Sequence, residues 1–286
     1  MQKLFLLLAF VILIFPANSF AAEDSPKTGY FVTSDGVKLR YIEAGKGSAI
    51  LFEPGWTMSA EIWEKQIDYF AKNYHVVAID PRSQGESDKP SEGHYPERRA
   101  RDIKELVDHL KLAPVTLVGW SMGVAEALTY VELFGTDSLS GLVLVDGFIG
   151  RDQTSVLTVF QGFLKSLQTD RKKFTENFVR GMYSKKYSED YLEKVMATSL
   201  KTPTNSAVVL FMNTFMKDYR PILEKIDKPL LALYTPFLKD DAGSVKQKVP
   251  SAKVELFDGA GHALFVDEAD KFNKLLEQFI KDYPSK

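Results

Sequence analysis

Short apolar runs alternate along most of the chain with segments in which apolar residues recur every three to four positions. The runs are typical of strands buried on both faces of a sheet, and the segments between them have helical spacing. This alternation predicts an α/β fold, a mostly parallel sheet with helices on both faces. The expected strands are 49–52, 74–79, 115–118, 142–145, 229–234 and 253–257; the expected helices are 59–73, with Ser59 as N-cap, 97–110, 122–134, 243–249 and 267–280.

Two further features complete the expected architecture. Residues 29–45 resemble two strands joined at Asp35-Gly36, a dipeptide that favours a hairpin turn, which brings the sheet to eight strands. Residues 149–226 have helical spacing throughout and are rich in Phe and Met. We therefore expect a helical cap at 149–226, inserted into a core formed by 29–148 and 227–286.

The N-terminus has the pattern of a secretory signal. Lys3 precedes an apolar run at 4–15, and small residues around Ala21 follow. Such a run is too short to span a bilayer, which takes about 20 residues. We expect cleavage after Ala21, removal of residues 1–21, and a periplasmic or secreted protein with no stable membrane anchor; the alternative is an uncleaved anchor. The chain has no cysteine, so it cannot be a lipoprotein.

Charge and composition argue against two kinds of ligand, nucleic acids and cofactors. The formal net charge is −2 and no basic stripe is present, which argues against nucleic-acid binding. The sequence contains no cluster with metal-ligand spacing, so neither a metal nor an organic cofactor is expected.

The central motif is Gly119-Trp120-Ser121-Met122-Gly123, a G-x-S-x-G that follows an expected strand and precedes an expected helix. In this context the serine occupies a sharp strand-to-helix turn, where flanking glycines prevent collisions. The N–H groups at the start of the helix would face developing negative charge. The motif predicts Ser121 as a nucleophile.

The order of motifs resembles the α/β-hydrolase superfamily, especially its small bacterial esterase and cofactor-free haloperoxidase-like branch. The resemblance covers nearly all of 29–282 and rests on 52–56, 80–87, Ser121 and 258–262. It implies an oxyanion hole formed by the backbone N–H groups of Trp56 and Met122. Pro54 stands where the family usually has His, but the expected donor belongs to Trp56, so the hole is retained.

His262 is the expected general base. A histidine titrates near neutral pH, so it can accept the serine proton and return it to a leaving group. His262 follows the last expected strand in a glycine-rich loop, whereas the other histidines lie in a strand, a turn and a helix end.

The acid of the triad has three candidates. Most relatives carry it after the strand that ends here at Tyr234, and that place holds no carboxylate; Asp240 and Asp241 come later, where each could cap a helix. Some branches carry the acid after the sixth strand, where Asp146 stands. We favour Asp146 as the residue that orients His262.

These residues predict a serine hydrolase that cleaves a small hydrophobic ester, a lactone or an activated amide through an acyl-enzyme. Trp56, Trp120, Phe148 and Phe265 are expected to contact the substrate. One alternative is a cofactor-free oxygenase or perhydrolase. Another is a non-catalytic sensor with the same fold.

Overall fold

One eight-stranded sheet forms the centre of the protein. The computed structural model describes residues 25–150 and 153–284. The strand order is β1-β2-β4-β3-β5-β6-β7-β8, and β2 runs antiparallel to both of its neighbours while β3 to β8 are mutually parallel, as predicted. The strands are β1 (Lys27–Val32), β2 (Lys38–Ala44), β3 (Ala49–Glu53), β4 (His75–Asp80), β5 (Val115–Trp120), β6 (Leu139–Val145), β7 (Leu230–Tyr234) and β8 (Lys253–Leu256).

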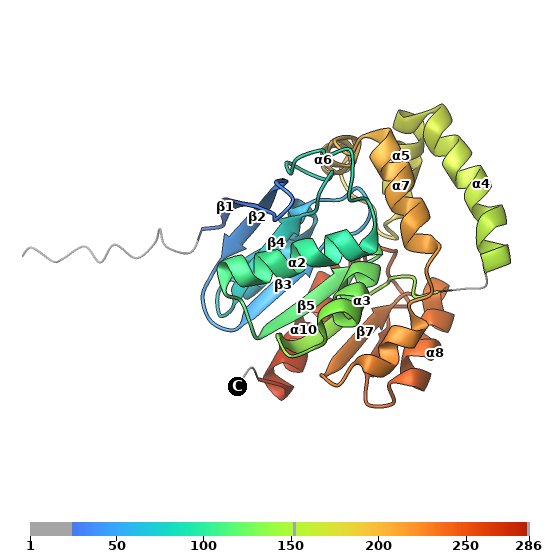
Figure 1. Ribbon diagram of the computed structural model, residues 1–286. Coiled ribbons are helices and arrows are strands. Elements are labelled where there is room, and N and C mark those ends of the chain that lie inside the picture. Colours follow the sequence, from blue (N-terminus) through green and yellow to red (C-terminus); the bar gives the residue numbers. More distant parts are fainter. Residues whose placement is uncertain (1–24, 151–152, 285–286) are drawn as a thin grey trace, which may run out of the picture.

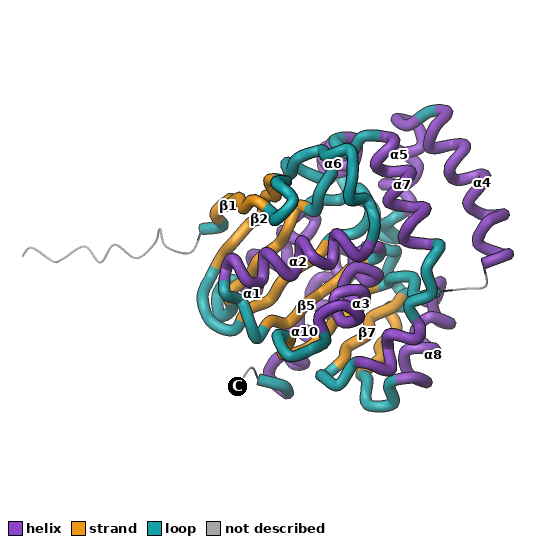
Figure 2. Tube along the Cα trace, in the orientation of Figure 1, coloured by secondary structure: helices purple, strands orange, loops and turns teal. Residues whose placement is uncertain are grey.

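Helices cover both faces of this sheet, which explains why the inner strands are continuously apolar. Every residue of β3 and β5 is buried. Figure 2 shows the strands as one twisted layer with helices in front of it and behind it. One apolar cluster includes α2 (Pro96–Leu110), α3 (Met122–Phe134) and α8 (Lys239–Lys248), and the other includes η1 (Ala60–Trp63), α1 (Glu64–Phe70), α9 (Leu264–Asp267) and α10 (Ala269–Asp282).

Between β6 and β7 the chain forms a group of helices that we call the cap helices, and it then returns through η2 (Arg220–Lys225). The cap helices lie over the carboxyl edge of the sheet, because Trp56 after β3 and Met122 after β5 pack against them in a shared apolar cluster. The indole N–H of Trp56 also donates to the carbonyl of Ala207, at 2.8 Å. The cap helices are α4 (Gln153–Thr169), α5 (Arg171–Gly181), α6 (Glu189–Leu200) and α7 (Thr204–Phe215).

Two expected helices differ in the structure. The predicted helix 59–73 is a 3₁₀ turn, η1, followed by α1, and the Ser59 hydroxyl donates to Glu61 instead of capping a helix. The predicted helix 267–280 corresponds to α10; its first predicted residue, Asp267, instead ends the short helix α9, and Glu268 between them is non-helical. Within 25–150 and 153–284, every helix is too short or too polar to cross a bilayer.

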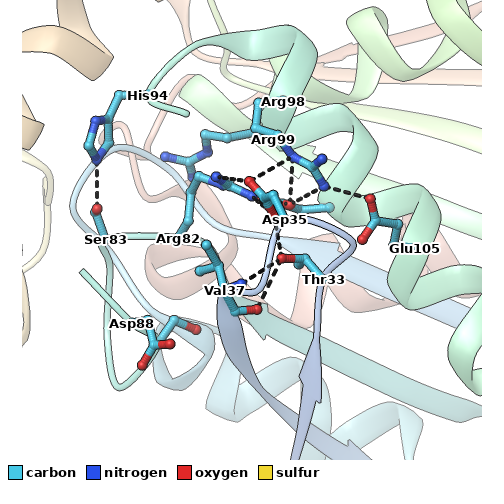
Figure 3. A network of polar contacts seen from close by, with 12 residues as sticks. Thr33, Asp35, Val37, Arg82, Ser83, Asp88, His94, Arg98, Arg99 and Glu105 are labelled. Carbon is cyan, nitrogen blue, oxygen red and sulfur yellow. Dashed lines mark hydrogen bonds and ion pairs between the residues drawn. The ribbon is translucent and has the colours of Figure 1, made fainter. Parts of the chain in front are cut away.

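A buried network of charges joins the β1–β2 turn to α2 and to the turn after β4 (Figure 3). Arg82 donates to both carboxylate oxygens of Asp102, at 2.6 and 2.7 Å, and also to Asp35. Partial burial alone would raise the pKa of Asp35. Hydrogen bonds from Arg82 and Thr33 and the nearby arginine charges outweigh this effect and lower that pKa from 3.8 to about 2.

This pKa shift makes the free energy of unfolding depend on pH in the acid range. Because the folded-state pKa of Asp35 is depressed, its stabilising contribution is present above the unfolded-state pKa and is lost as the pH falls from about 4 to about 2. The Asp35 side chain is 39% exposed, so water screens its pairs and we expect a loss on the order of 1 kcal/mol. Urea unfolding across this pH range should show the loss of unfolding free energy in wild type and not in Asp35→Asn. The exposed control variant Asp137→Asn should show the same loss as wild type. An equal acid response in wild type and Asp35→Asn would contradict the assignment.

Candidate active site

Ser121 occupies the sharp turn between β5 and α3. Its φ is 56° and its ψ is −115°, a left-handed conformation that non-glycine residues rarely adopt. The flanking glycines are required by contact: a Cβ at Gly119 would collide with the carbonyl of Gly123, and a Cβ at Gly123 would lie 2.7 Å from the carbonyl oxygen of Glu53. The turn therefore fixes where the Ser121 hydroxyl points.

A chain of hydrogen bonds leads from this hydroxyl through His262 to Asp146. The Nε2 atom of His262 lies 2.9 Å from Ser121 Oγ, and Nδ1 lies 2.7 Å from Asp146 Oδ2. The second oxygen of the buried Asp146 accepts bonds from the backbone N–H and the hydroxyl of Thr235, at 2.7 and 2.9 Å. The carboxylate is thus held from two sides and faces the imidazole.

The other aspartate candidates lie elsewhere. Asp240 and Asp241 are in the first turn of α8, where Asp241 accepts a bond from the backbone of Ile149 at 3.1 Å and Asp240 is exposed. Among the contacts of the described residues, neither carboxylate reaches His262. The structure therefore brings Asp146, and not Asp240 or Asp241, to the imidazole.

Trp56 and Met122 bring their backbones to the same point. A Cβ at Gly55 would lie 2.9 Å from the Cβ of Ser121, so the loop after β3 passes against the nucleophile turn. Within the part of the chain that the structure describes, the N–H groups of Trp56 and Met122 donate to no protein acceptor. Both donors are therefore available to a ligand atom beside Ser121.

A cavity of about 660 Å³ opens above these groups. Ser121, His262 and Asp146 contribute to its lining, and the remaining wall is mainly aromatic. Among the described residues, no lysine, arginine or glutamate lines it. The aromatic wall consists of Trp56, Phe148, Phe160, Phe163, Phe178, Phe211, Phe215 and Phe237.

The structure separates the four predicted substrate contacts into two pairs. Trp56 and Phe148 line the cavity, but Trp120 and Phe265 do not. Both are buried in the core below, where Phe265 stacks on Trp63 with ring centroids 4.0 Å apart. The indole N–H of Trp120 donates to the carbonyl of His262 at 2.9 Å, so this ring supports the histidine loop from beneath.

A family model described as alpha/beta hydrolase fold matches residues 48–269. The chain belongs to the α/β-hydrolase family.

Relatives of this α/β hydrolase include esterases and haloperoxidases. It is 26% identical to a non-heme haloperoxidase of Rhodococcus erythropolis, over 88% of this chain and 99% of that protein. It is 27% identical to a bifunctional esterase/perhydrolase of Acinetobacter calcoaceticus, over 88% and 99%. An esterase structure from Exiguobacterium antarcticum shares the fold, with a TM-score of 0.82 and 24% identity over 88% of this chain and 98% of that one. These similarities are to esterases and haloperoxidases of the same fold.

A buried ionic cluster lies beneath the Ser121 turn of this α/β hydrolase. Arg99 of α2 approaches Glu126 of α3 to 2.7 Å and Glu53 at the end of β3 to 3.6 Å. Burial and the negative charge of Glu126 raise the pKa of Glu53 well above its usual range, and burial also raises the pKa of Glu126. These shifts favour a pair that retains one proton, which leaves a single negative charge for Arg99 to balance.

Asp267 is a site residue that the sequence analysis missed. One of its oxygens accepts bonds from the backbone N–H of Gly261, beside His262, and from the backbone N–H of Ser184, both at 2.8 Å. Its other oxygen accepts from the hydroxyl of Tyr187 at 3.0 Å. Asp267 thus ties the histidine loop to the segment between α5 and α6, and no sequence motif marks it. In the described ranges, no group of three or more His, Cys, Asp or Glu residues could hold a metal ion.

The hydrogen-bond chain predicts the reactivity of Ser121, and this can be tested before any substrate is known. In Asp146→Asn the side-chain amide favours the wrong tautomer of His262, and we expect phosphonylation of Ser121 by a fluorophosphonate to slow on the order of 10⁴-fold. Stopped assays with the labelled probe and intact-mass detection would give the rate constants.

The matched control is Asp240→Asn, an exposed aspartate of α8 whose loss should leave the phosphonylation rate within about twofold. Near-normal labelling of a folded Asp146→Asn variant would contradict the role of Asp146 in orienting His262.

Proposed function

We propose that this hydrolase cleaves carboxylic esters, lactones or activated amides through an acyl-enzyme formed on Ser121. The observation that carries the proposal is the hydrogen-bond chain from Ser121 Oγ through His262 to Asp146, which ends at the floor of an apolar cavity. A hydroxyl bonded to a neutral imidazole, itself oriented by a carboxylate, is the arrangement that acyl transfer requires.

In acylation, Ser121 Oγ attacks the carbonyl carbon of the ester while Nε2 of His262 takes the hydroxyl proton. The carbonyl oxygen becomes an oxyanion, and the N–H groups of Trp56 and Met122 donate to it. When the carbonyl re-forms, the bond to the alcohol oxygen breaks and His262 protonates that oxygen. The alcohol leaves, and the acyl group stays on Ser121.

Deacylation repeats these steps with water. His262, neutral again, takes a proton from water as the water oxygen attacks the acyl carbon. Ser121 Oγ leaves with the proton from His262, and the carboxylic acid is released. Asp146 accepts the Nδ1–H bond throughout and stabilises each transient imidazolium.

The cavity supports a neutral, hydrophobic substrate. Its aromatic wall favours apolar groups, and the lining offers no lysine or arginine among the described residues to bind a carboxylate or a phosphate. We therefore propose a small-molecule ester with an apolar acyl or alcohol group.

Perhydrolysis is a second candidate, favoured by the similarity to the bifunctional esterase/perhydrolase. In that reaction hydrogen peroxide takes the place of water: its oxygen attacks the acyl carbon and His262 accepts its proton. The bond from the acyl carbon to Ser121 Oγ then breaks, His262 returns the proton to Oγ, and a peroxycarboxylic acid leaves. The same groups serve both reactions, so one acyl-enzyme supports both.

Hydrolysis of p-nitrophenyl esters from acetate to laurate tests the main proposal. We expect turnover by wild type and a loss on the order of 10⁴-fold or more in Ser121→Ala, because the covalent route is closed. Product analysis with and without hydrogen peroxide separates hydrolysis from perhydrolysis. Folded wild type that turns over none of these esters would contradict the proposal and favour the oxygenase or the sensor; oxygen consumption distinguishes those two.

We also propose export with cleavage after Ala21, from the sequence alone, since residues 1–24 lie outside the described structure. Mass spectrometry of the protein from periplasmic extract or medium should find Ala22 at the N-terminus. Full-length protein confined to the membrane fraction would support the uncleaved anchor instead.

A further inference from the structure

The loop that carries Trp56 contains an unusual backbone conformation. Thr57 has a φ of 61° and is fully buried. A β-branched residue at positive φ is a genuine outlier, because its branched Cβ crowds the backbone. Such a strained conformation persists only where the surroundings hold it in place.

A turn hydrogen bond from the N–H of Met58 to the carbonyl of Gly55, at 3.1 Å, supplies part of that restraint, and Gln84 supplies more. Its Nε2 donates to the carbonyl oxygens of Gly55 and Met58, at 3.1 and 2.6 Å. Its Oε1 accepts from the backbone N–H of Thr57, at 3.2 Å. One fully buried amide therefore binds the loop at Gly55, whose carbonyl shares a peptide with the Trp56 N–H, and at Thr57 and Met58.

Gln84 is itself held from behind. Arg99 Nη1 donates to Gln84 Oε1 at 3.0 Å, and Arg99 also pairs with Glu126 on α3. The first residue of α3 is Met122. The Arg99–Gln84 pair thus connects the loop of Trp56 with the helix that begins at Met122, the two segments expected to supply the oxyanion donors.

A third contact comes from the cap helices. The hydroxyl of Thr57 lies 2.8 Å from the hydroxyl of Ser199, a residue of α6. Ser199 therefore restrains the Thr57 side chain, whereas Gln84 restrains the main chain, including the Gly55 carbonyl of the peptide that carries the Trp56 N–H.

We propose that Gln84 is a positioning residue for the oxyanion hole: its hydrogen bond to the Gly55 carbonyl fixes the Gly55–Trp56 peptide, which carries the Trp56 N–H, and its bonds to Thr57 and Met58 hold the strained turn that follows. The proposal rests on the ester hydrolysis proposed above. Gln84 suits the task because one side chain must offer two donors and an acceptor in a dry site. Methionine has a similar length and offers neither an N–H nor a carbonyl.

The direct test is Gln84→Met, assayed with the p-nitrophenyl ester that wild type hydrolyses best. A displaced oxyanion donor weakens only the transition state, so we expect kcat to fall about 10- to 100-fold with KM changed by less than about threefold. An alkylboronic acid, which forms a tetrahedral adduct on the serine, should lose affinity by the same factor as kcat/KM.

Ser87→Ala is the matched control. Ser87 is buried in the same turn and bonds the carbonyl of Asp80 and the N–H of Arg40, but not the loop of Trp56. We expect its kcat and boronate affinity to stay within about threefold of wild type even where its melting temperature drops. If Gln84→Met does not fold, Gln84→Glu replaces it; an ionised carboxylate cannot donate to Gly55 or Met58, so the same selective loss of kcat is expected.

The outcomes separate this proposal from the function on which it rests. Wild-type turnover that Ser121→Ala abolishes, together with a Gln84 variant no more impaired in kcat than Ser87→Ala, would overturn the positioning role and leave the hydrolase intact. A rise in KM at unchanged kcat would also overturn it. Absence of ester turnover by folded wild type would overturn both.

Discussion

Backbone strain at the carboxyl edge of the sheet is the constraint on which the rest of the site depends. Thr57, Ser121 and Asp146 all have positive φ, and each directly follows or closely follows a strand, β3, β5 or β6. Isolated, such residues would relax toward extended or helical angles. They stay in place because neighbouring parallel strands end together there and because buried hydrogen bonds restrain each one. The reactive geometry is therefore a property of the sheet edge as a whole.

The buried polar groups beneath this edge supply those restraints. Arg99 links β3, α2 and α3 through Glu53 and Glu126, and it reaches the loop of Trp56 through Gln84. Groups of this kind contribute little net stability, since desolvation offsets much of their attraction. Their effect is directional, because a paired side chain in a dry site has few alternative positions. The cluster thus contributes more to fixing the positions of the site residues than to the free energy of folding.

Sequence patterns predicted the sheet, its order of elements and the residues that the structure gathers at Ser121, because strand ends and turn motifs are local features. They did not separate Trp120 and Phe265 from the cavity wall, since closeness to the nucleophile along the chain does not say on which side of the sheet edge a ring packs. Gln84 and Asp267 were missed for another reason: they act on partners 29 and 83 positions away, Gly55 and Ser184, which no local motif encodes.

The cap helices leave and re-enter the core between two strands that are hydrogen-bonded neighbours. Asp146 stands just before the departure and Thr235 just after β7, and the two residues bond directly. Three residues after Asp146, the stem of the insertion is closed by the backbone N–H of Tyr219, which donates to the carbonyl of Ile149 at 2.9 Å. Helices can be lengthened, shortened or exchanged beyond this closed stem while the groups around Ser121 keep their relative positions. This architecture lets natural variation or protein engineering change what the cavity accepts independently of how it reacts.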